Sequence, residues 1–87
     1  MKKIECPCCG NYTIESDDEV IVEICEVCFW QYDLVAQKRP EENIGANGVS
    51  LIDARRNYKK YRACKKEFAD VGLVREPTFE ELPENNV

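Results

Sequence analysis

Four cysteine positions carry the clearest chemical signal in this chain. Cys6 and Cys9 form one C-x2-C pair, and Cys25 and Cys28 form a second pair after fifteen intervening residues. Two such pairs at this spacing are typical of a site in which four thiolates surround one metal ion. Each tight turn points two sulfurs at the ion, and the chain between the pairs completes the tetrahedron. The sequence therefore predicts a structural site for one zinc ion per chain, with these four thiolates as its ligands.

The first pair lies in the run CPCCG, which offers three thiols for two ligand positions. Pro7 fixes the backbone inside the turn, and Gly10 tolerates the positive φ expected directly after the second ligand. This register assigns Cys6 and Cys9 to the metal and leaves Cys8 in the loop between them. Cys8 is then either a small residue at a permissive position or a thiol for ligand exchange and oxidation sensing.

Two other chemistries compete for the same thiols. A tetrahedral four-sulfur site suits iron as well as zinc, and CPCCG looks like a rubredoxin knuckle, although the second pair lacks the matching proline and glycine. A thiol oxidoreductase would need a reactive cysteine at a helix start, which this part of the sequence does not predict. Cys64 falls in a helical pattern, where a free cysteine behaves as a small hydrophobic residue rather than a ligand.

Length and composition exclude several classes of function. The chain has 87 residues, which indicates one domain. Its core is too small to stabilise the fold alone, so a further stabilising element such as a bound metal ion is expected. It contains no histidine, so the commonest general base is absent, and no phosphate-binding glycine loop is present. We therefore expect a protein that is not an enzyme. The start of the chain lacks an apolar signal region and no stretch is long enough to span a membrane, which favours a cytoplasmic location.

The elements that must position the cysteines are predicted as a small α+β fold, in which zinc-ribbon-like β-hairpin knuckles are covered by one C-terminal amphipathic helix. Residues 1–34 form the β unit: the stretches NYTIE and VIVEIC are expected to pair across the turn SDDE, and FWQYDL is a third candidate strand. Residues 35–50 are predicted to be a loop, residues 51–70 a helix and residues 71–87 an acidic tail.

The predicted helix begins after Ser50, with Asp53 three residues on as in a capping box. Its buried arc is Leu51, Ala54, Tyr58, Tyr61, Cys64 and Phe68. Asn57 falls inside this arc and needs partners, so we expect it to hydrogen-bond the backbone of the loop at residues 45–48. Gly72 is expected to end the helix.

In the tail, Thr78 and Glu81 predict a short capped turn. Phe79 and Leu82 are expected to pin this turn to the body of the molecule.

Charge is strongly segregated along the chain. Residues 1–34 carry two basic and eight acidic side chains, residues 51–66 carry seven and one, and residues 67–87 carry one and six. The basic side chains of the predicted helix lie opposite its apolar arc: Arg55, Arg56, Lys59, Lys60, Arg62 and Lys66. Like charges four residues apart repel, so an anionic group should lie nearby. That group is either the acidic hairpin or tail of this chain, or else an acidic protein or a nucleic-acid backbone.

Three stretches together resemble the bacterial family of small cysteine-rich proteins named for its CPCC motif. They are CPCCG, CEVCFW with Asp33 shortly after it, and GANGVSLIDARRNY at residues 45–58. Where that family usually has a proline after the third cysteine, this chain has Glu26. The resemblance implies a zinc-ribbon-like site and a fixed GANGVS loop docked against it, with Asn57 as its anchor, and it implies no particular activity.

Taken together, the sequence predicts a non-enzymatic zinc-binding module that mediates protein interaction. A nucleic-acid-binding ribbon that uses the basic helix is the first alternative, and a rubredoxin-like iron or thiol redox protein is the second.

Overall fold

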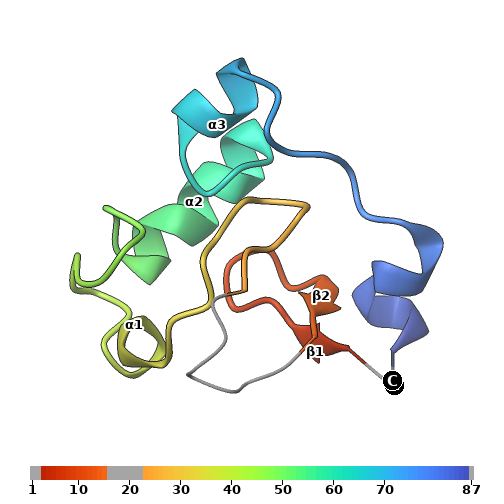
Figure 1. Ribbon diagram of the computed structural model, residues 1–87, viewed down its shortest axis with the longest axis horizontal. Coiled ribbons are helices and arrows are strands. Elements are labelled where there is room, and N and C mark those ends of the chain that lie inside the picture. The colour runs from red at the N-terminus through yellow and green to blue at the C-terminus, as the bar shows by residue number, and fades with distance from the viewer. Residues whose placement is uncertain (1–2, 16–22, 87) are drawn as a thin grey trace.

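A computed structural model describes residues 3–15 and 23–86 of the chain (Figure 1). Two short strands, β1 (Ile4–Glu5) and β2 (Tyr12–Ile14), pair antiparallel around the first cysteine turn. Ile4 pairs with Ile14 and Glu5 with Tyr12, so the register shifts by one residue between the two pairs. A single antiparallel bridge between Ile24 and Gln31 closes the second cysteine turn in the same way.

The predicted strands are found only in part. NYTIE contains β2, which pairs with β1, a strand that was not predicted. The first half of VIVEIC, residues 20–22, and the turn SDDE lie outside the described residues, and so does their predicted pairing. In FWQYDL only Gln31 takes part in a bridge, because Asp33 then starts a helix.

The helix α1 (Leu34–Lys38) occupies the start of the segment predicted to be a loop. Asp33 caps it, since its Oδ1 accepts hydrogen bonds from the backbone N–H groups of Val35 and Ala36 at 2.9 and 3.2 Å. The prediction of a loop over the whole of residues 35–50 is therefore wrong at its start. The capping aspartate outweighed the nearby Pro40, which lies past the end of this short helix.

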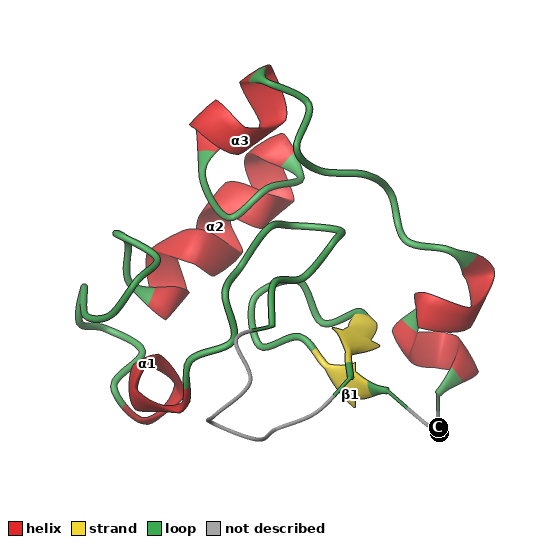
Figure 2. Ribbon diagram, viewed as in Figure 1, coloured by secondary structure: helices red, strands yellow, loops and turns green. Residues whose placement is uncertain are grey.

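The predicted helix over residues 51–70 is divided into α2 (Leu51–Tyr61) and α3 (Lys66–Asp70), as Figure 2 shows. Ser50 caps α2 as predicted: its Oγ accepts from the Asp53 N–H at 3.1 Å. The prediction of one continuous helix is wrong because Arg62 adopts a left-handed conformation with φ of 62° and ends α2. Gly72, with φ of 74°, follows the end of α3.

The C-terminal segment contains two 3-10 turns, η1 (Phe79–Glu81) and η2 (Pro83–Asn85). Thr78 and Glu81 form the predicted capping box. Arg75 adds two hydrogen bonds of 2.8 and 2.9 Å to the Glu81 carboxylate, and this ion pair lowers the pKa of Glu81 to about 2. Phe79 is 71% exposed, so the prediction that it pins the turn to the body is wrong. Buried Glu81 and its arginine hold the turn instead.

The core lies between the two cysteine turns and α2. Its largest fully buried side chains are Trp30, Ile14, Leu51 and Val27, together with four cysteines. From α2, Leu51, Ala54 and Tyr58 are buried against them. Within the part of the chain that the structure describes, no helix has the length and apolar character needed to cross a membrane.

Candidate metal centre

Two cysteine turns of the same geometry build the site. We call residues 6–10 the first knuckle and residues 25–29 the second knuckle. In the first, the Gly10 N–H donates to the Cys6 carbonyl at 2.9 Å, and the Cys6 N–H donates to the Asn11 carbonyl at 2.8 Å. These bonds bend the chain so that both thiols of the turn point to one side, with Pro7 and left-handed Gly10 fitting the backbone as predicted.

The second knuckle repeats this hydrogen-bond pattern nineteen residues later. The Phe29 N–H donates to the Cys25 carbonyl at 2.8 Å, and the Cys25 N–H donates to the Trp30 carbonyl at 2.9 Å. Each residue therefore has a counterpart nineteen positions away, as Cys6 has in Cys25 and Cys9 has in Cys28. The two knuckles are structurally equivalent although the second lacks proline and glycine.

Phe29 takes the place of Gly10 in the second knuckle. Its φ of 69° lies in the left-handed region, which costs a residue with a side chain about 1–2 kcal/mol. The ring packs edge-on against Phe68, with 4.9 Å between ring centroids. Contact with α3 therefore helps to hold an aromatic residue where the first knuckle uses glycine.

The four predicted ligand sulfurs come together at one point. The Sγ atoms of Cys6, Cys9, Cys25 and Cys28 all lie within 4.8 Å of one another. Cys6 Sγ lies 3.7 Å from Cys28 Sγ, and Cys9 Sγ lies 3.7 Å from Cys25 Sγ. Sulfurs bound at about 2.3 Å to a tetrahedral ion are separated by roughly 3.8 Å, so the spacing and the donor type fit zinc or iron.

The environment of the sulfurs is nearly closed to solvent. Cys6, Cys25 and Cys28 are fully buried, and only Cys9 is partly exposed. Hydrogen bonds from its neighbours, first Cys28 and then Cys6, lower the pKa of the Cys25 thiol, whereas the bond to Cys25 raises the pKa of Cys28. The cluster therefore favours negative charge on Cys25, which is the state a metal ligand needs.

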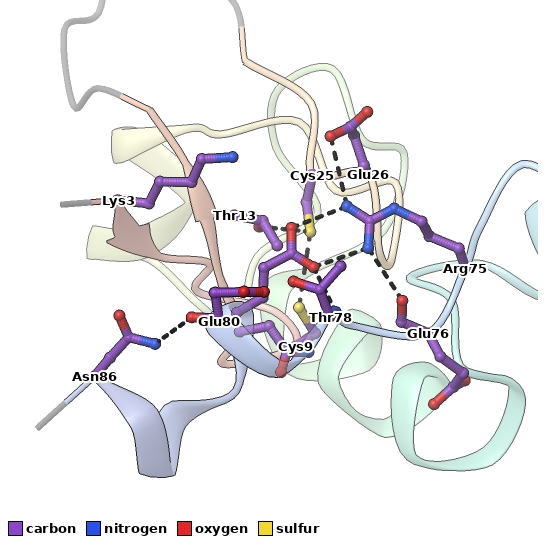
Figure 3. A network of polar contacts seen from close by, with 12 residues as sticks. Lys3, Cys9, Thr13, Cys25, Glu26, Arg75, Glu76, Thr78, Glu80 and Asn86 are labelled. Atoms are coloured by element: carbon purple, nitrogen blue, oxygen red, sulfur yellow. Dashed lines mark hydrogen bonds and ion pairs between the residues drawn. The ribbon is translucent and has the colours of Figure 1, made fainter. Parts of the chain in front are cut away.

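Thr13 contributes a hydrogen bond to the site that was not predicted from the sequence. Its buried hydroxyl donates a hydrogen bond of 2.9 Å to Cys25 Sγ, as Figure 3 shows. Thr13 belongs to β2, so the hairpin of the first knuckle supplies a donor to a ligand of the second. The alternation of the strand gives no sign of this contact, because it depends on how the two knuckles face each other.

The break between α2 and α3 also contacts the site. The Cys64 N–H donates to the Cys28 carbonyl at 2.9 Å, and the Asn57 side chain donates to the Cys64 carbonyl at 2.9 Å. Asn57 was expected to bond the loop at residues 45–48. It holds a backbone group as predicted, but in the segment that follows its own helix.

The two remaining cysteines lie in the core. Cys8 is 7% exposed and Cys64 is fully buried. Cys8 is the counterpart of fully buried Val27 in the second knuckle, which supports its interpretation as a small core residue. Burial raises the pKa of the Cys64 thiol to about 12, so Cys64 stays neutral, as expected of a small hydrophobic residue.

The GANGVS loop is fixed by Asn47 rather than by Asn57. The buried side-chain amide of Asn47 accepts from the Gln31 N–H at 2.8 Å and donates to the Gln31 carbonyl at 2.9 Å, as a neighbouring strand would. At Gly45, with φ of 83°, an added Cβ would collide with the Asp33 carboxylate that caps α1. The loop thus packs against Gln31, which follows the second knuckle, and against the N-terminal cap of α1.

The predicted basic residues find several partners. Arg62 forms an ion pair of 2.8 Å with Glu76, Arg56 pairs with Asp53 and Lys66 with Asp70. Arg55 donates to the Pro7 carbonyl at 2.8 Å. The stretch EELPENN instead places Glu81 against Arg75. Among the described residues, Glu76 is therefore the only residue of the acidic tail that pairs with one of the six predicted basic side chains.

The fold and the site define a small domain in which a β-hairpin knuckle and a second equivalent knuckle bring four thiols together, supported by α1, α2 and α3. The sequence profile of the Cysteine-rich CPCC family matches residues 4–81. The chain therefore belongs to the Cysteine-rich CPCC family, as the sequence motifs indicated. A search of curated proteins and a search of solved structures found no match.

Proposed function

We propose that this protein is a zinc-ribbon-like module in which Cys6, Cys9, Cys25 and Cys28 hold one structural zinc ion. The observation that carries the proposal is the convergence of four thiols from two equivalent knuckles, with sulfurs spaced as tetrahedral ligands are. Zinc binding of this kind contributes about 10 kcal/mol or more to folding, which exceeds what a core of this size supplies.

The centre is structural and the protein is not an enzyme. Four protein ligands occupy all coordination positions of a tetrahedral ion and leave none for water or substrate. The chain has no histidine to act as a general base. Thiolates of this kind persist in a reducing compartment, so the bacterial cytoplasm is the proposed location.

Metal analysis tests this proposal. Protein produced in medium that supplies both zinc and iron, and purified without chelators, should be colourless and contain one zinc per chain by elemental analysis. Cys25→Ser should lose the metal and the folded structure seen by circular dichroism. A red protein with one iron per chain would instead support the rubredoxin-like alternative, and an unmetallated folded protein would refute both.

The module acts by binding an acidic segment of another protein through the basic face of α2, which consists of Arg55, Arg56, Lys59 and Lys60. All four residues are exposed. Among the described residues, Lys59 and Lys60 make no ion pair with an acid, and they lie one helical turn from Arg55 and Arg56, so a positive strip remains. A protein partner fits better than a nucleic acid because the chain as a whole has a net charge of −5, which repels a long polyanion.

Charge reversal tests this surface. The zinc-loaded protein is used to capture partners from a bacterial lysate with and without nuclease treatment, beside the variant Lys59→Glu/Lys60→Glu and the control Lys38→Glu/Arg39→Glu. We expect a captured protein that is lost with the α2 variant and retained with the control. Capture that disappears on nuclease treatment would favour the nucleic-acid alternative, and capture that survives the α2 variant would refute this surface.

A further inference from the structure

One ligand residue of the proposed centre, unlike the other three, is partly exposed to solvent. Cys9 is partly exposed, whereas Cys6, Cys25 and Cys28 are fully buried. Cys8 and Cys64 are also buried. Cys9 is therefore the ligand residue that is most accessible from solvent.

Cys25 is the neighbour placed to react next. Its Sγ lies 3.7 Å from Cys9 Sγ, and Figure 3 shows the two sulfurs pointing toward each other. The Thr13 hydroxyl, which donates to Cys25 Sγ at 2.9 Å, stabilises negative charge on that sulfur. A disulfide bond is about 2.0 Å long, so the two sulfurs must approach by roughly 1.7 Å to form one.

Cys8 is a poor partner for Cys9 despite being next to it. Adjacent Cα atoms are about 3.8 Å apart, which is shorter than the usual span of about 4.4–6.8 Å between disulfide-bonded residues. A bond between these neighbours would have to distort the first knuckle. Cys8 is therefore not the preferred disulfide partner of Cys9, although the two residues are adjacent in the sequence.

We propose that the Cys9–Cys25 edge is an oxidation site for hydroperoxides, at which disulfide formation releases the metal. This inference rests on the proposed function, because it concerns thiolates held by zinc. It makes the module a sensor of peroxide, since loss of two ligands removes the ion that stabilises the fold.

The chemistry uses one peroxide per disulfide. The Cys9 thiolate attacks a peroxide oxygen, the O–O bond breaks, and the leaving oxygen takes up a proton to give water from hydrogen peroxide. Cys9 is now a sulfenic acid. The Cys25 thiolate attacks the Cys9 sulfur, the S–S bond forms, the S–O bond breaks, and the departing hydroxide is protonated to water. The two thiolates lose two electrons to the peroxide, and two protons are consumed.

The experiment begins with reduced protein whose zinc content has been measured. Hydrogen peroxide is added below one equivalent, zinc release is followed with a chromogenic chelator, and remaining thiols are blocked with iodoacetamide. A glutamate-specific protease then cuts after Glu5, Glu15, Glu23 and Glu26, which separates Cys25 from Cys28. We expect zinc release in proportion to peroxide, and a disulfide that joins residues 6–15 to residues 24–26 through Cys9 in tandem mass spectra.

Matched variants complete the test. Cys8→Ser and Cys64→Ser should both release zinc with the wild-type dependence on peroxide and give the same linked peptides. A first disulfide that joins residues 6–15 to residues 27–41, or that uses Cys6 or Cys8, would overturn the inference, as would zinc retained at full peroxide equivalence. Absence of zinc from the reduced starting protein would instead refute the proposed function.

Discussion

Cys8 and Val27 occupy the same place in the two knuckles, nineteen residues apart, and both are buried. A side chain at this place is buried in the core, and Cys8 is not one of the four cysteines whose sulfurs lie within 4.8 Å of one another, although its thiol is near enough to Cys28 to raise the pKa of that ligand. The equivalence gives Cys8 a packing role that needs no thiol chemistry. The second knuckle already shows that valine is compatible with this backbone.

Cys8→Val should therefore retain the metal and the fold, with a change in stability below about 1.5 kcal/mol, since it replaces one small apolar group by another. Cys9→Ser should lose both, because it removes a ligand. Zinc content by elemental analysis and thermal unfolding of the two variants check this prediction. Loss of zinc from Cys8→Val would show that the ligand register in the first knuckle is different.

Thr13 is expected to tune the centre through its hydrogen bond to Cys25 Sγ. Thr13→Val keeps the shape but removes the donor, and loss of such an outer contact typically weakens metal binding 10- to 100-fold. Thr13→Ser keeps the hydroxyl and serves as the matched control. Competition with a chelator of known affinity measures the effect, and equal zinc affinity in Thr13→Val and wild type would contradict it.

At the scale of elements, the GANGVS loop and α1 depend on one close approach. An added Cβ at Gly45 would collide with the Asp33 carboxylate, which caps α1. At Gly48 it would meet only the flexible end of Lys65, 3.1 Å away. Both glycines have positive φ, so alanine is strained at either position.

Gly45→Ala should consequently be much more destabilising than Gly48→Ala. We expect about 1 kcal/mol for Gly48→Ala from backbone strain alone, and about 3 kcal/mol for Gly45→Ala, where the cap of α1 is also lost. Chemical unfolding of the zinc-loaded variants measures the difference. Equal losses would mean that Asp33 moves aside without cost.

At the scale of elements, local sequence patterns were sufficient to predict several helix and turn boundaries. The caps Ser50 and Thr78 and the stop at Gly72 were predictable because each depends on residues within a few positions. The break at Arg62 was not, since no glycine or proline marks it. It is stabilised by the bond from the Cys64 N–H to the Cys28 carbonyl, which joins segments far apart in the chain.

For the whole molecule, ligand spacing predicted which four thiols would converge, because their arrangement is set by two local turns. The supporting contacts of Thr13 and Asn47 could not be predicted, since each joins separate elements. The pairing of β2 with β1 was missed for the same reason: strand periodicity identifies a strand but not its partner.

Metal removal should unfold the molecule as a unit, and Cys64 can report it. Its pKa of about 12 in the folded state, against 9.0 ordinarily, keeps the thiol neutral and favours folding until the pH rises above about 9. At pH 8, iodoacetamide should label Cys64 only after a strong chelator removes the ion. Mass spectrometry of residues 43–67 measures the labelling, and rapid labelling of the zinc-loaded protein would contradict it.

The contact between Asn47 and Gln31 has a consequence for the ageing of the protein. Asn47 precedes Gly48, the setting in which asparagine deamidates most readily. Deamidation would replace the donating Nδ2 by an anionic oxygen facing the Gln31 carbonyl, so that attraction becomes repulsion. The long-term stability of the fold therefore depends on the side-chain amide of Asn47, which pairs with the Gln31 backbone as a neighbouring strand would.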